Sequence, residues 1–187
     1  VLDDSFDKAN VSGKELLAVS SKAFCVINDE VEDKMRASVE KARLDGDSVG
    51  GVIECAVVGV PVGIGANIFS TVEGHISSAL FGVPAVKGVE FGAGFDFAKM
   101  TGYEANDTYS ISNGNVKINK NNNGGVLGGM TTGAPIIVRA VVKPTPSISK
   151  AQKSVNLQKM TEEELVIHGR HDPCIVPRAV PVVESAV

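Results

Sequence analysis

Residues 168–184 read HGRHDPCIVPRAVPVVE, and the rest of the chain is organised around this stretch. Its first eleven residues hold two histidines, two arginines, an aspartate and a cysteine, and three prolines interrupt the run. Proline fixes its own φ, removes a backbone donor and pushes the preceding residue away from helical geometry. We therefore expect a stiff segment, extended or turn-like, that holds these polar residues in place: His168, Arg170, His171, Asp172, Cys174 and Arg178.

The polar groups of this stretch have the chemistry of a functional site. Arg170 offers a planar guanidinium that suits phosphate or carboxylate and keeps its charge at any working pH. His171 and Asp172 are neighbours, so one can exchange a proton while the other sets the local charge. Arg178 has two open roles, a ligand contact or a structural ion pair with Glu184.

A zinc site is an alternative interpretation, because His168, His171 and Cys174 follow the spacing H-x-x-H-x-x-C. A fourth ligand is not apparent in the sequence, and Pro173 disturbs the helix that would align the three side chains. We therefore expect no metal, and metal analysis of the dialysed protein tests this.

Hydrophobic periodicity predicts an order of helices and strands that is typical of an α+β fold. Asp29 should begin a helix in a capping box with Glu32, and Gly46 should end it. Strands are expected at 48–60, 85–92 and 136–142, a short helix at 94–102, and hairpins within 103–120 and 151–168. Another helix should end near Phe81 and turn five apolar residues inward: Ile68, Val72, Ile76, Ala79 and Leu80. Residues 1–187 should form one domain, with helices packed on an antiparallel sheet.

Two loops have the parts needed to bind a phosphorylated cofactor. Residues 124–133 are rich in glycine, which lets backbone N–H groups approach an anion closely. Residues 143–147, KPTPS, add one positive charge and two hydroxyl groups on a segment stiffened by two prolines. The glycines of residues 61–69 lack the rest of a nucleotide-binding fingerprint, so we interpret that segment as a structural turn.

The composition restricts the class of protein. A length of 187 residues with 43% apolar residues suits one domain with one core. The net charge of −4, without a basic block, argues against nucleic acid as a partner. Three widely spaced cysteines indicate free thiols in a reducing compartment. Neither an apolar run of membrane-spanning length nor a signal peptide is visible, so we expect a soluble cytoplasmic protein with no membrane partner.

Three segments of the chain resemble chorismate synthases. GRHDPC at 169–174, followed by PRAVPVVE at 177–184, resembles the C-terminal signature of that family. AVKGVEFGAGF at 85–95 and NNNGGVLGGMTTGAPIIVRAVVKPTPSI at 121–148 agree in order and spacing. The resemblance begins near Cys25, the N-terminal motifs of the family are absent, and the chain ends just inside what should be a closing helix. It implies the C-terminal portion of a larger core, a β-α-β sandwich of antiparallel sheet and helices that assembles as a homotetramer.

The resemblance also implies site residues. Asp172 matches the aspartate thought to relay a proton to or from the flavin, and is the expected catalytic residue. His171 is a candidate for orienting it. Pro84 and Ala85 match a flavin-contacting pair at which the residue type varies. The remaining positions that match contacts to flavin mononucleotide (FMN) are Gly128, Lys143, Pro144, Thr145, Pro146, Ser147 and Arg170.

The implied reaction is the anti elimination of phosphate from 5-enolpyruvylshikimate-3-phosphate to give chorismate, a step of aromatic amino-acid biosynthesis. It needs reduced FMN without net redox change, and NADPH is a possible reductant because family members differ in how the flavin is reduced. The two catalytic histidines and most substrate-binding arginines of the family lie in the part that has no match here. We therefore expect this chain alone to be inactive, and an alternative is a non-catalytic flavin-binding or oligomerisation module. A flavin or phosphosugar binder of another chemistry is disfavoured, because glycine loops are common whereas the run at 170–174 is not.

Overall fold

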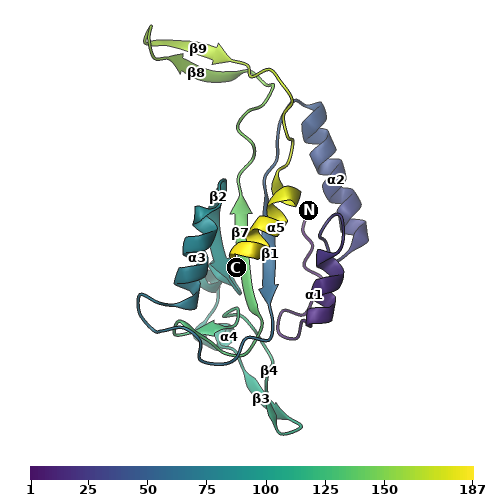
Figure 1. Ribbon diagram of the computed structural model, residues 1–187, viewed down its shortest axis with the longest axis vertical. Helices are drawn as coiled ribbons and strands as arrows, with labels where there is room; N and C mark the ends of the chain where they lie inside the picture. The colour runs from purple at the N-terminus through teal and green to yellow at the C-terminus, as the bar shows by residue number, and fades with distance from the viewer.

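The computed structural model describes residues 1–187 as a small antiparallel sheet with two helices on one face and two projecting hairpins (Figure 1). The sheet has the order β1-β7-β2, with β1 at Gly51–Val57, β7 at Ile136–Val142 and β2 at Val86–Phe91. Both outer strands run antiparallel to β7. The prediction of an α+β fold with an antiparallel sheet is confirmed.

One face of the sheet carries the core. Alternate residues of β7 are almost completely buried on that face, among them Val138, Ala140 and Val142. They pack against α3 (Val72–Gly82) and α5 (Val176–Ala186), which contribute Leu80 and Val183. Because the side chains of a strand alternate between faces, the strand IIVRAVV places its small apolar residues toward these helices and Arg139 on the other side.

The remaining elements surround this centre. Helices α1 (Gly13–Ser20) and α2 (Asp29–Leu44) lie beside the β1 edge (Figure 1). A 3-10 helix η1 (Gly94–Lys99) and α4 (Gly102–Ala105) follow β2, where one short helix was predicted. The hairpins are β3–β4 (Tyr109–Ser112, Asn115–Ile118), β5–β6 (Val126–Leu127, Met130–Thr131) and β8–β9 (Gln152–Asn156, Thr161–Leu165). None of the helices combines the length and apolar character that a membrane span requires.

Three local predictions were wrong. The cap of α2 is Asn28, whose side chain accepts from the Glu30 N–H at 2.9 Å, so Asp29 begins the helix instead of capping it. The second error concerns the residues expected to face inward from α3. Ile76 and Leu80 are buried as expected. Ile68 instead precedes that helix and is 62% exposed, and Ala79 faces solvent.

The third error concerns the prolines near the C-terminus. Residues from Val176 onward form α5 and are not extended. Pro177 falls in the first turn, where a helix needs no backbone donor, so it favours the start of the helix. Pro181 lies inside the helix and cannot donate to the carbonyl four residues back. The helix persists because Val183, 1% exposed, is buried against the sheet.

The turn predicted at 61–69 is fastened to β6 by Thr131, which is 3% exposed. Its hydroxyl donates to the Pro61 carbonyl at 2.6 Å and accepts from the Ile64 N–H at 2.9 Å. Replacing Thr131 by valine keeps the shape but leaves both backbone groups unpaired, so we expect unfolding free energy to fall by about 2 kcal/mol. Denaturant titration of T131V tests this, with the exposed strand position T161V as a control expected to stay within about 0.5 kcal/mol.

The chain exposes much more surface than a compact monomer of its mass. The solvent-accessible area is 11784 Å² for 19.5 kDa, whereas the usual scaling predicts about 8,500 Å². Two projecting hairpins account for part of the excess of roughly 3,000 Å² (Figure 1). The rest is available for contacts outside this chain.

Candidate functional site

The connection between α2 and β1 ties together two of the segments singled out in the sequence. The Ser48 hydroxyl donates to the Thr145 carbonyl at 2.6 Å, and the Val49 N–H donates to the Pro173 carbonyl at 2.8 Å. Gly50 lies so close to the chain that a Cβ there would meet the Val142 carbonyl. The structure therefore brings residues 143–147 and the His168–Cys174 region to the same end of the sheet.

Pro84 and Ala85 lie at this end too. The Lys143 N–H donates to the Ala85 carbonyl at 2.9 Å, which joins the end of β7 to the start of β2. Ala85 has φ +72°, a left-handed conformation that is costly for a residue with a Cβ. Such strain tends to be kept at binding sites, and here it fixes the backbone beside Lys143.

Two cations and one hydroxyl of this region have no partner within the chain. Lys143 and Arg170 are exposed, and neither is among the residues that form ion pairs. The Thr145 hydroxyl is buried and makes no hydrogen bond. A buried hydroxyl without a partner is uncommon in a folded protein, and beside two free cations it fits an anionic ligand such as a phosphate group.

Asp172 sits beside these groups with partners of its own. Its carboxylate forms an ion pair with Arg178 and accepts from the Cys174 N–H at 3.2 Å. Of the two roles left open for Arg178, the structure thus shows an ion pair, with Asp172 in place of Glu184. His171 bonds through Nε2 to the Ile167 carbonyl at 2.9 Å. Burial, and then the charge of Asp172, raises the pKa of the Cys174 thiol, which keeps that side chain neutral.

Gly128 lies at the opposite end of the sheet. It forms the turn of the β5–β6 hairpin with Gly129, at φ +57° and +85°. The Gly129 carbonyl accepts from the N–H of Val72, the first residue of α3, whereas Ala85 follows the other end of that helix. The structure therefore separates Gly128 from the other predicted flavin contacts.

The zinc alternative has no ligand set in the structure. Nowhere in the chain do three or more histidine, cysteine or acidic side chains converge so that they could hold a metal ion. The His171 ring is turned to a backbone carbonyl.

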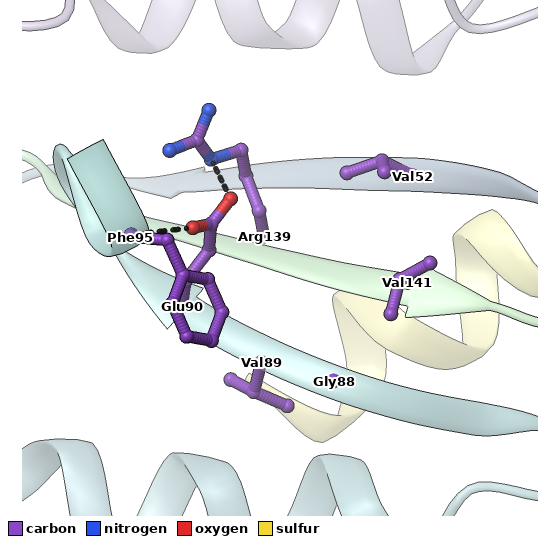
Figure 2. A pocket seen from close by; sticks show the side chains of 7 residues that line it. All are labelled: Val52, Gly88, Val89, Glu90, Phe95, Arg139 and Val141. Carbon is purple, nitrogen blue, oxygen red and sulfur yellow. Dashed lines mark hydrogen bonds and ion pairs between the residues drawn. The ribbon is translucent and has the colours of Figure 1, made fainter.

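A second feature, on the open face of the sheet, was missed in the sequence. Arg139 lies between two acidic residues: its Nε is 3.0 Å from the Glu90 carboxylate (Figure 2) and 3.8 Å from that of Glu54. Lys8 binds Glu54 at 3.0 Å. The signal for this cluster was one charged residue in each of three apolar strands that the register places side by side: Glu54 in β1, Arg139 in β7 and Glu90 in β2. The hollow beside this cluster measures about 210 Å³, which is smaller than typical ligand pockets of about 300–1,000 Å³. None of the predicted site residues lines it.

Cys55, on β1, should be an unreactive thiol. Burial, and then the charge of Glu184, raises its pKa from 9.0 to about 11. At pH 8 the thiolate fraction is therefore about a hundredfold lower than for an unperturbed thiol, and iodoacetamide should react about a hundredfold more slowly. Because the folded pKa is the higher one, this contribution to stability is complete below pH 9 and is lost as the pH rises toward 11.

The rate is best measured in a protein whose only cysteine is Cys55, with C25S and C174S substituted. The same protein unfolded in guanidinium chloride serves as the control. Equal rates in the folded and unfolded proteins would contradict a raised pKa.

Comparison with known proteins identifies the family of the chain. A sequence model of the chorismate synthase family matches residues 8–187. Chorismate synthase of Korarchaeum cryptofilum is 52% identical over 84% of this chain and 44% of its own length. That of Thermococcus gammatolerans is 51% identical over 95% of this chain and 49% of its own length. A crystal structure of chorismate synthase superposes with a TM-score of 0.74 at 28% identity, over 97% of this chain and 48% of the other. The chain spans about half the length of the relatives it matches, and it belongs to the chorismate synthase family.

Proposed function

We propose that this chain forms part of an enzyme that converts 5-enolpyruvylshikimate-3-phosphate to chorismate and phosphate, a lyase reaction that requires reduced FMN. Membership of the family supports the reaction. The observation in the structure that supports it best is the end of the sheet where Lys143, Arg170 and the unpaired Thr145 hydroxyl lie beside Asp172.

The residues of this end fit a phosphate-bearing cofactor. Lys143 and Arg170 would neutralise its phosphate, and the hydroxyls of Thr145 and Ser147 would donate to phosphate oxygens. Pro144 and Pro146 hold the loop, while Pro84 and Ala85 give it a rigid neighbour. Gly128, at the opposite end of the sheet, remains a flavin contact that only the family resemblance predicts. When bound, reduced FMN supplies electron density that eases the departure of the substrate phosphate.

Asp172 is proposed as the group that moves a proton at this site. Arg178 and the Cys174 N–H hold its carboxylate in one orientation, so that one oxygen can accept a proton and return it. His171, fixed by the Ile167 carbonyl, is the proposed orienting neighbour. NADPH as reductant, a homotetrameric assembly and a cytoplasmic location remain predictions from the resemblance and the composition.

The alternative is that this chain alone binds flavin, or mediates assembly, without turnover. Two measurements on the same protein distinguish the functions. The first is an anaerobic titration with reduced FMN, in which both the enzyme and a flavin-binding module should show binding. The second is anaerobic formation of chorismate, which only the enzyme produces. Absence of both binding and turnover would exclude a flavin-dependent role.

A further inference from the structure

The connection between α2 and β1, residues 46–50, holds both segments of the proposed phosphate site, and we call it the clamp. Its Ser48 hydroxyl bonds to the Thr145 carbonyl, and its Val49 N–H bonds to the Pro173 carbonyl. Figure 1 shows the three segments running alongside one another beyond the sheet. A single short connection therefore fixes two loops that are about a hundred residues or more away in the sequence.

The loop between β7 and β8 has little else to fix its backbone. No backbone–backbone hydrogen bond involves residues 144–148, and two of these residues are prolines, which have no N–H to donate. One other side chain reaches the backbone of this loop, that of Gln152, whose amide is 3.4 Å from the Pro146 carbonyl. The bond from Ser48, at 2.6 Å, is much shorter, so we expect it to contribute most to the orientation of the loop.

The backbone of Gly50 packs against the same loop. A Cβ at Gly50 would lie 3.0 Å from the Pro144 ring and would also meet the Val142 carbonyl. Because glycine has no Cβ, the clamp can lie directly against the loop at this point. The loop is thus held by packing at Pro144 and by a hydrogen bond at the next residue, Thr145, which leaves it little freedom to turn.

The two oxygen atoms of Thr145 have different surroundings. Its carbonyl oxygen accepts the bond from Ser48, whereas its hydroxyl is buried and has no partner in the chain. Both oxygens belong to one residue, so a rotation of its backbone would move them together. The bond to the carbonyl therefore fixes the direction in which the hydroxyl is offered to a ligand.

From these contacts we infer that Ser48 is a positioning residue of the proposed phosphate site. Through the Thr145 carbonyl, it sets the orientation in which the Thr145 hydroxyl meets the phosphate of FMN. Ser48 acts through Thr145 and not on the ligand, since its one hydroxyl proton is donated to that carbonyl. This inference rests on the proposed function and adds to it a residue outside the segments that carry the chemistry of the site.

The first test compares the affinities of the whole protein for FMN and for riboflavin, which lacks the phosphate. S48A should weaken FMN binding about tenfold, the effect of one well-placed hydrogen bond, and should leave riboflavin binding unchanged. S48T keeps the hydroxyl and should restore most of the affinity for FMN. S38A is the matched control, because the Ser38 hydroxyl also donates to a backbone carbonyl, that of Lys34 at 3.0 Å, on the exposed surface of α2. It should bind both flavins normally.

Three results of this test would overturn the inference. The first is an S48A protein that binds FMN as the wild type does. The second is an equal loss of FMN and riboflavin binding, which would show that Ser48 supports the fold in general. The third is an S48T protein that binds FMN no better than S48A, because the hydroxyl would then not be the cause of the effect.

The second test asks whether Ser48 acts through Thr145. T145V removes the buried hydroxyl and keeps the shape of the side chain, so the orientation of residue 145 should then matter much less. We expect S48A to weaken FMN binding about tenfold in the wild type but by less than about twofold in the T145V background. Losses that simply add in the double variant would contradict action through Thr145.

The outcomes separate this inference from the proposed function. If the wild type binds FMN more tightly than riboflavin and S48A does the same, the flavin function stands and the role of Ser48 is overturned. If the wild type binds neither flavin, the flavin function fails, and the role of Ser48 fails with it because there is no phosphate to position. Selective loss of FMN binding in S48A supports both.

Discussion

Replacing Gly92 by alanine is expected to lower the free energy of unfolding by about 3 kcal/mol, because two penalties coincide there. Gly92 has φ +55°, and an added Cβ would strike the Asn122 carbonyl and the Gly124 N–H. Neither group can move easily. The Asp107 carboxylate accepts from the Asn122 N–H at 2.6 Å, and Gly124 bonds through its carbonyl to Ile137 at 3.2 Å. The clash would therefore separate β2 and β7 at their shared end.

A matched variant isolates the contribution of the clash. Gly114 also has positive φ, +76°, but nothing lies within 4 Å of its added Cβ, so G114A should cost only the conformational term of about 1 kcal/mol. Thermal unfolding measures both. At this chain length G92A should melt roughly 6–12 °C below the wild type, and equal losses in the two variants would show that the Asn122 loop yields.

The sequence predicted best where one periodicity dominated. The strand IIVRAVV matched β7 residue for residue, and the hairpin expected within residues 103–120 is the β3–β4 pair. The prolines of residues 173–181 led to the wrong prediction of an extended segment where α5 forms, because proline opposes the interior of a helix but favours its first turn. Only packing, here the burial of Val183, decides which effect prevails.

The sequence suggested candidate site residues one by one, but not their arrangement in space. Lys143, Thr145 and Arg170 carry recognisable chemistry, whereas Ser48 and Val49, which hold their segments together, have no local signal in the sequence. The separation of Gly128 from Lys143 was not foreseen either. It follows from the direction of β7 and α3, which is set by tertiary contacts, and no spacing along the chain encodes it.

The largest effect on binding is expected for K143M combined with R170M, which should weaken the affinity for FMN by at least about a hundredfold. A hydrogen bond to a charged partner contributes about 1.5–3 kcal/mol, and both cations are free of ion pairs within the chain, so each can give its full charge to a phosphate. Because both side chains are exposed, their removal should leave the free energy of unfolding within about 0.5 kcal/mol. Fluorescence titration measures the affinity, and denaturant titration the stability.

Riboflavin distinguishes a phosphate contact from a general loss of the site, since it has the flavin ring without the phosphate. If Lys143 and Arg170 bind the phosphate, the double variant should bind riboflavin as the wild type does, and FMN should lose its advantage over riboflavin. Added salt should weaken FMN binding in the wild type more than in the variant, because exposed charges are screened. K14M with K34M makes the same change of charge at exposed positions distant from the site. An equal loss of FMN affinity in that control would mean that the effect comes from the net charge of the protein. Unchanged FMN affinity in the K143M and R170M double variant would mean that the phosphate binds at another place.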